Sequence, residues 1–360
     1  MRGTFSFHPL RLEFFDDTIQ PLLAGRKINP EEFLDAALRV RTRSATARRW
    51  VWALEEILAT SEPPRPERGA GILRNIRTHL ERFDYREDET TLRVKKAIEP
   101  DLHLHGRPFF VTEGSAGRVA KRIDEFLSAP DVGAAESLAI EQLVHLDAEL
   151  AKTIEPVEGP DLSPDMAYRS DLLSNLKDLY DIAHAARRGD NWGRADTPRK
   201  PAREVLLTEL PHRALLLHSR AVPFWVARDV DGLETVCRAA GVPPPDFIVP
   251  PRRLFAEACE EFAELKEALH VEVSGPRDVG AFVAAGDIPE LVEFLNRNGT
   301  RIIQVATRHD EGPACTTLLR KIRECAAYAD RNGLGYLEAS GILPPDLGGA
   351  EPDREDGAET

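Results

Sequence analysis

The pattern of apolar residues changes near residue 200, and this change constrains the possible folds more than any other feature. Before that point, apolar side chains recur at i, i+3, i+4 and i+7, which is the spacing of one face of an α-helix. After it, short apolar runs of strand length alternate with helical segments. The sequence therefore predicts a mostly helical first half and a second half that combines helices with a sheet.

Four apolar stripes in the first half have helical spacing. They comprise Trp50, Leu54, Ile57 and Leu58; Ile72, Ile76, Leu80 and Phe83; Leu143, Leu146, Leu150 and Ile154; and Leu172, Leu176, Leu179 and Ala183. Segments rich in proline separate them at 61–69 and 155–165, and proline ends a helix because it has no N–H to donate. These stripes predict at least four helices.

The second half contains seven runs of strand length. They span 205–210, 214–218, 222–227, 247–249, 279–284, 301–306 and 334–338. Two helical stripes among them end at Asn298-Gly299 and Asn332-Gly333, which are typical helix stops. The order strand, helix, Asn-Gly, strand thus occurs twice between 279 and 338. This repetition predicts two consecutive β-α-β units and a sheet with parallel pairs.

A chain of 360 residues is long enough for two domains. The segment 188–203 has no periodicity and few apolar residues, which is typical of a linker. The predicted fold is therefore a two-domain α+β or α/β protein, with a helical domain at 1–187 and a smaller α/β domain at 204–343. Residues 344–360 are rich in acidic residues, glycine and proline, and are expected to form a disordered tail.

Composition limits the partners. The net charge of -14 disfavours nucleic acid, which binds basic surfaces. Five arginines between Arg39 and Arg49 form the strongest basic patch, and they either contact phosphates or belong to a solvated helix entry paired with Glu55 and Glu56. No apolar run reaches the roughly 18 residues of a membrane span. We therefore expect a soluble protein with protein partners, without a membrane partner, and with any small-molecule ligand left open.

The cysteines and the N-terminus favour the cytoplasm. Cys237, Cys259, Cys315 and Cys325 include no CxxC pair, which fits reduced core thiols better than disulfides or a zinc cage. The first residues lack the cleavage site of a signal peptide.

The hexapeptide DLHLHG at 101–106 is the sharpest local pattern. On a strand, Asp101, His103 and His105 would share one face, because side chains two positions apart point the same way. Paired imidazoles at this spacing can hold zinc, manganese or iron.

Over these six residues the chain resembles the first-strand motif of the amidohydrolase and PHP-type metal-dependent hydrolases. The resemblance implies that His103 and His105 bind a divalent metal and that a metal-bound water attacks an amide or a phosphate ester. Later strands would add further ligands, and His218 and His309 each follow an apolar run where such a ligand would lie. The alternative is that both histidines form ordinary hydrogen bonds in a loop.

A second candidate site lies in the loop before the helix that carries Leu318. A helix N-terminus lowers the pKa of a thiol, so Cys315 is a candidate nucleophile with His309 as its base. In the alternative interpretation, Asp310 or Thr307 caps the helix, Pro313 occupies its first turn, and Cys315 packs as a small apolar side chain.

The adjacent aromatics Phe224 and Trp225 raise a related question. On a strand one of them faces inward and the other outward, so Trp225 is either core or an exposed anchor for a partner.

These patterns leave two functions open. Phosphate-binding glycine loops, GxSxG and HExxH are missing from the sequence. We therefore expect a cytoplasmic interaction or regulatory protein that acts through protein–protein surfaces and needs no cofactor. The alternative is an enzyme, either a metal-dependent hydrolase that uses Asp101, His103 and His105, or a thiol enzyme that uses Cys315.

Overall fold

A six-stranded sheet lies at the centre of the computed structural model, which describes residues 3–61, 92, 94, 102–105, 107–157, 165–193, 198–259, 280–309 and 311–340. The strand order is β3-β2-β6-β1-β8-β7, and every neighbouring pair is antiparallel. The strands are β1 (Gly3–Leu10), β2 (Leu102–Leu104), β3 (Arg107–Pro108), β6 (Phe224–Val230), β7 (Gly280–Val283) and β8 (Gly335–Ser340). A separate hairpin pairs β4 (Asn191–Trp192) with β5 (Lys200–Pro201).

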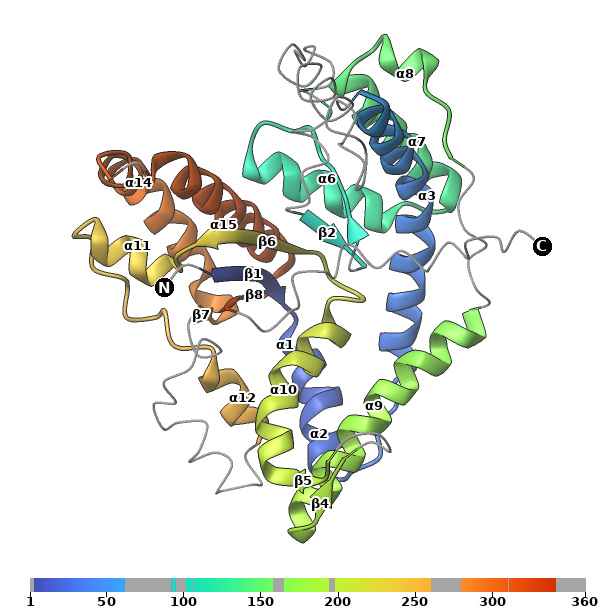
Figure 1. Ribbon diagram of the computed structural model, residues 1–360, viewed down its shortest axis with the longest axis vertical. Coiled ribbons are helices and arrows are strands. Elements are labelled where there is room, and N and C mark those ends of the chain that lie inside the picture. Colours follow the sequence, from blue (N-terminus) through green and yellow to red (C-terminus); the bar gives the residue numbers. More distant parts are fainter. Residues whose placement is uncertain are drawn as a thin grey trace, which may run out of the picture.

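Helices cover both faces of the sheet (Figure 1). One face packs against α6 (Ala116–Ser128), α11 (Leu233–Ala239), α14 (Ile288–Thr307) and α15 (Gly312–Asn332). The other packs against α1 (Leu12–Phe14), the π-helix η1 (Phe15–Ile19), α2 (Gln20–Leu23), α9 (Asp165–Arg188), α10 (Ala202–His218) and α12 (Arg252–Ala258). A third cluster joins α6 to α3 (Glu31–Ser61) and α7 (Val132–Leu146), next to the short α8 (Leu150–Thr153). The short 3-10 helix η3 (Ala285–Asp287) leads into α14.

Alternation along β1 explains why the sheet needs a layer on each side. Phe5 and Phe7 belong to the core under α15, whereas Leu10 belongs to the core under α10. Ser6 lies between the two phenylalanines, and His8 follows Phe7. Both face the α10 side, because side chains alternate on a strand. Both faces of β1 are buried, so neither side can be left to solvent.

The sheet takes strands from both sides of the predicted linker. β1 and β2 precede residue 188, whereas β6, β7 and β8 follow residue 203. The predicted linker itself contains both β4 and β5. The prediction of a mixed helix-and-sheet fold is confirmed. Because strands from both sides of the linker form one sheet, the division into two domains stays a prediction.

The prediction of two β-α-β units is wrong. Residues 301–306 form the last turns of α14 rather than a strand. The chain therefore crosses from β7 to β8 through two helices, α14 and α15, which pack side by side (Figure 1). Two helices reverse the chain once more than one helix does, so β7 and β8 run antiparallel.

Asn298-Gly299 lies inside α14 and does not end it. The role of Gly299 is to let α15 pack against α14. A Cβ at this position would collide with the guanidinium of Arg323 on α15. Without it, Arg323 crosses α14 and its Nη2 donates to the carbonyl oxygen of Leu295 at 2.8 Å. The second stop is confirmed, since Gly333 caps α15 in the left-handed conformation.

The runs 205–210 and 214–218 were also predicted as strands, and both lie in α10. Pro211 stands inside this helix and divides its apolar residues into two strand-like runs. Leu206, Leu210 and Ala214 are all buried at a spacing of four, which is the period of a helix.

The predicted stripe at Leu143, Leu146, Leu150 and Ile154 is divided between two helices, because Asp147 is extended after α7 and its Oδ1 accepts from the backbone N–H of Leu150 at the start of α8. Two other helical stripes are confirmed where the structure describes them. Leu172, Leu176, Leu179 and Ala183 are buried along α9. Trp50 and Leu54 are buried along α3. The predicted stripe at 72–83 and the predicted tail at 344–360 lie outside the described residues.

Trp225 belongs to the core, as one of its two interpretations predicts. Its side chain is fully buried, and its Nε1 donates to Oε2 of Glu324 at 3.0 Å. Lys321, one turn earlier on α15, donates from Nζ to the carbonyl oxygen of Val226 at 2.7 Å. These two bonds fix α15 on β6 and satisfy polar groups that burial would otherwise penalise.

Two buried histidines lie on the opposite face. His8 stacks on Phe224 with ring centroids 5.4 Å apart, and within the described part of the chain neither of its ring nitrogens has a hydrogen-bond partner. Nε2 of His218 accepts from the backbone N–H of Arg11 at 3.1 Å, so this imidazole carries its proton on Nδ1 when neutral. Burial lowers the pKa of His8 to about 3 and also lowers the pKa of His218, with help from His8 and Arg11.

His8→Leu should therefore reduce the acid sensitivity of the fold. The unfolded chain binds a proton at His8 below pH 6.5, whereas the folded chain resists it down to about pH 3, so stability falls as the pH falls through this window. As the pH falls, the free energy of unfolding of the wild-type protein should decrease by up to roughly 1.4 kcal/mol per pH unit because of His8. The variant should not show this decrease. Urea unfolding at several pH values measures the difference. His145→Leu, at a half-exposed position on α7, is the control and should retain the wild-type slope.

Candidate functional site

β2 places His103 in a stack of aromatic rings. His103 pairs with Phe224 across β2 and β6, and their rings stack with centroids 4.9 Å apart. His8 stacks on the same Phe224 from β1. His103 thus belongs to a row of rings across three neighbouring strands.

His105 points to a different neighbour. It follows the end of β2 and has a φ of 55°, a left-handed conformation that is uncommon for a residue with a side chain. Its Nε2 lies 2.5 Å from the hydroxyl of Tyr168 on α9, and the guanidinium of Arg41 lies 4.6 Å above the ring of Tyr168. Burial raises the pKa of Tyr168 to about 12, although Arg220 and Arg41 oppose the shift.

The two histidines of the predicted metal motif thus have different neighbours. The turn at His105 breaks the extended geometry on which their shared face depends. Asp101 lies outside the described residues. Among the residues that are described, no group of three or more His, Cys, Asp or Glu side chains could hold a metal ion. The metal site gains no support from these residues and stays a prediction.

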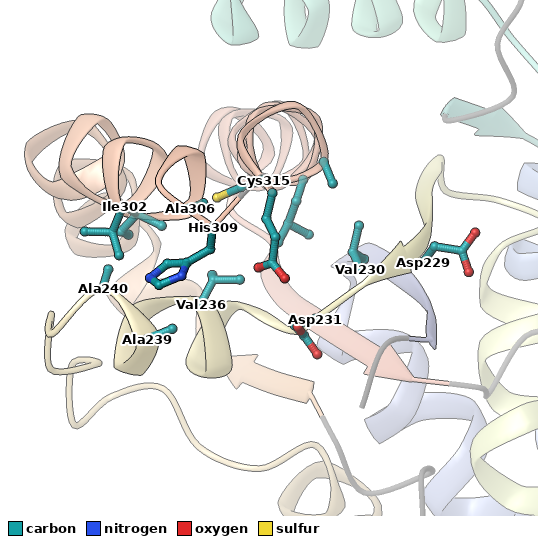
Figure 2. A pocket seen from close by; sticks show the side chains of 14 residues that line it. Asp229, Val230, Asp231, Val236, Ala239, Ala240, Ile302, Ala306, His309 and Cys315 are labelled. Atoms are coloured by element: carbon teal, nitrogen blue, oxygen red, sulfur yellow. The ribbon is translucent and has the colours of Figure 1, made fainter.

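His309 and Cys315, the second predicted pair, line one small pocket of about 60 Å³. Figure 2 shows the His309 ring directed toward Val236 and Ala239 on α11 and the C-cap residue Ala240, with Cys315 above it on α15. In the described structure no hydrogen bond joins His309 to Cys315. The pocket walls are mostly apolar, and its volume suits one or two water molecules rather than a substrate.

The position of Cys315 near the start of α15 does not activate its thiol. Burial raises the pKa of Cys315, and the Glu311 carboxylate raises it further. Glu311 is the N-cap residue, so a negative charge stands where the predicted mechanism requires stabilisation of a thiolate. Pro313 occupies the first turn, and Cys315 is 5% exposed, both as the alternative interpretation predicts. This geometry favours a packed thiol.

The most strongly perturbed carboxylate is Glu338, which the sequence analysis did not single out. Its Oε1 accepts from the backbone N–H of Leu233 at 3.0 Å, and the hydroxyl of Tyr336 lies 3.2 Å from its Oε2. Burial raises the pKa of Glu338 to about 7, although both hydrogen bonds oppose the shift. Because it accepts from the first residue of α11, this carboxylate holds the start of that helix against β8.

A larger concave surface lies at the β7 edge of the sheet. We call it the β7 groove; its volume is about 390 Å³, within the range of binding pockets in proteins. Six apolar side chains form its floor: Leu12, Phe15, Phe247, Val249, Leu254 and Phe282. They come from α1, η1, the segment before α12, α12 itself and β7, so only the tertiary fold brings them together.

The rim of the β7 groove is acidic. Its charged residues are Asp16, Asp246, Arg253, Glu257 and Asp287. Arg253 pairs with Glu257 through Nε at 3.3 Å. Burial raises the pKa of Asp16, and the nearby carboxylates of Asp17, Glu13 and Glu257 raise it further. The rim thus concentrates negative charge around an apolar floor.

Few sequence signals point to this groove. Asp16 and Asp17 follow two phenylalanines and belong to a π-helical turn. Such turns are rare in proteins, and those that do occur are often at functional sites. The other rim residues lie more than 200 positions later, in three short segments without a common motif.

Comparison with known proteins identifies no relative: no family model matches the chain, and no curated protein or solved structure matches it.

Cys315 should react with iodoacetamide only at high pH. Because burial and Glu311 raise the pKa of this thiol above 9.0, the labelling rate should keep rising past pH 9 instead of reaching a plateau below pH 7. Peptide mass spectrometry across a pH series measures it, and Cys315→Ala identifies the labelled peptide. A plateau below pH 7 would restore the activated nucleophile.

Glu338→Gln should change the pH dependence of stability in the opposite sense to His8→Leu. The folded protein holds the Glu338 proton more tightly than the unfolded chain, so this contribution is present below pH 4.5 and is lost as the pH rises to about 7. Glutamine imitates the protonated form, so the variant should be more stable than wild type by up to a few kcal/mol near pH 8. Urea unfolding measures it. Glu293→Gln, at an exposed position on α14, should leave the profile unchanged.

Proposed function

We propose that this chain is a cytoplasmic interaction or regulatory protein that binds a short segment of a protein partner in the β7 groove. The observation that carries this proposal is the groove itself, an apolar floor of about 390 Å³ framed by charged side chains. Interfaces between proteins combine such an apolar centre with a polar rim.

The position of the groove also supports the proposal. β7 is an edge strand, and apart from β8 its described partner is a single bridge between Phe282 and Val249. Edge strands and the loops beside them are common docking places for extended segments. The floor combines side chains from helices, from β7 and from the segment before α12, which a bridge between Val249 and Phe282 ties to the sheet.

Two further observations fit this function. All four cysteines are free and buried, as expected for a reducing compartment. Within the described part of the chain, no helix combines the length and the apolar composition needed to cross a membrane.

Ala284→Trp tests the docking surface. Ala284 is exposed and lines the groove, so an indole there should fill the groove without disturbing the core. Peptides selected from a random displayed library on the wild-type chain should lose most of their binding to Ala284→Trp. Ala167→Trp, at an exposed position on α9, is the matched control and should bind them as wild type does.

Fluorescence anisotropy with labelled copies of the selected peptides gives the dissociation constants. A loss of at least about tenfold, or roughly 1.4 kcal/mol, is expected for Ala284→Trp. Equal binding to all three proteins, or a library that yields no enriched peptide, would contradict the proposal.

A further inference from the structure

Resting on the proposed function, we infer that the β7 groove selects a cationic segment, one in which lysine or arginine side chains flank an apolar residue. The apolar residue would contact Leu12, Phe247 and Val249, the half-buried side chains of the floor. The cationic side chains would meet the carboxylates of the rim. The two parts of the groove thus specify two features of one partner.

The charge balance of the rim carries the inference. Four carboxylates surround the floor, and among the described lining residues Arg253 is the one cation. Arg253 and Glu257 pair with each other, which leaves Asp16, Asp246 and Asp287 to face a partner. A partner with positive charge would relieve this imbalance, whereas an acidic one would add to it.

The surroundings of Asp16 extend the same field. Gln20 donates to Oδ1 of Asp16 at 3.1 Å, a neutral bond that does not cancel the charge. Asp17 and Glu13 lie close enough to disfavour the ionised form of Asp16. Repulsion among these groups raises the free energy of the empty groove, so a cation that binds there gains from its relief.

The apolar floor fits a bare metal ion less well than it fits a peptide segment. A bare metal ion would leave the six apolar side chains without contacts, and the described residues contain no group of three ligands that could hold one. A segment with both apolar and cationic side chains uses both surfaces. Its charged contacts lie at an exposed rim, so each should contribute modestly and respond to salt.

The peptides whose binding depends on Ala284 provide the test. Their sequences should be enriched in lysine and arginine relative to the unselected library. The double variant Asp16→Asn/Asp246→Asn should weaken the binding of a labelled cationic peptide by about three- to tenfold, and added salt should reduce this difference. Glu293→Gln, on an exposed turn of α14, is the control and should bind as wild type does. A copy of the same peptide with glutamine in place of every lysine and arginine should bind wild type and the double variant equally.

The outcomes separate this inference from the proposed function. Enriched peptides that need Ala284 but are neutral or acidic would overturn the charge preference and leave the docking surface intact. Peptides indifferent to Ala284→Trp would overturn both. Binding of spermidine or Mg²⁺ by calorimetry without any enriched peptide, or a dimer in sedimentation that Ala284→Trp dissociates, would replace the partner segment by a small cation, a metal or a second copy.

Discussion

Pairing of β1 with both β6 and β8 holds the two ends of the described chain together, and the rest of the structure depends on it. Phe5 lies opposite Ala227 on one side and Ser340 on the other. Without β1, the sheet would divide into β3-β2-β6 and β8-β7. Contacts between residues more than 300 positions apart also make such a fold depend on late, non-local pairing.

The two faces of this sheet bury their polar groups in different ways. On the α15 side, Trp225 and Lys321 each find a hydrogen-bond acceptor, and Glu338 accepts a backbone N–H. On the α10 side, His8 is buried among aromatic rings without such compensation. The Glu338 site favours a protonated carboxyl and the His8 site a neutral imidazole, so acid acts on them with opposite signs. Stability near neutral pH is therefore a balance between the two faces.

Three of the candidate site residues make contacts that the predicted sites did not include. His103 stacks on Phe224, His105 meets Tyr168, and Cys315 has a raised pKa beside Glu311. The β7 groove differs from these places because its charged side chains remain at the surface while its floor stays apolar. It combines an apolar floor with a rim in which four carboxylates outnumber Arg253, the one cation among the described lining residues.

Local helices and strands could be predicted from the sequence wherever one spacing of apolar residues continued without interruption. The buried stripe of α9 and the glycine cap of α15 follow from spacing and from the left-handed conformation at Gly333. Pro211 and Gly299 resemble helix breaks in the sequence. Both nevertheless lie inside helices, which tertiary contacts maintain. Strand direction, the central place of β1 and the β7 groove were decided by the tertiary structure alone. The reason is physical: periodicity records which face of an element is buried, whereas partners hundreds of residues away decide what covers that face and which charges come together at its edge.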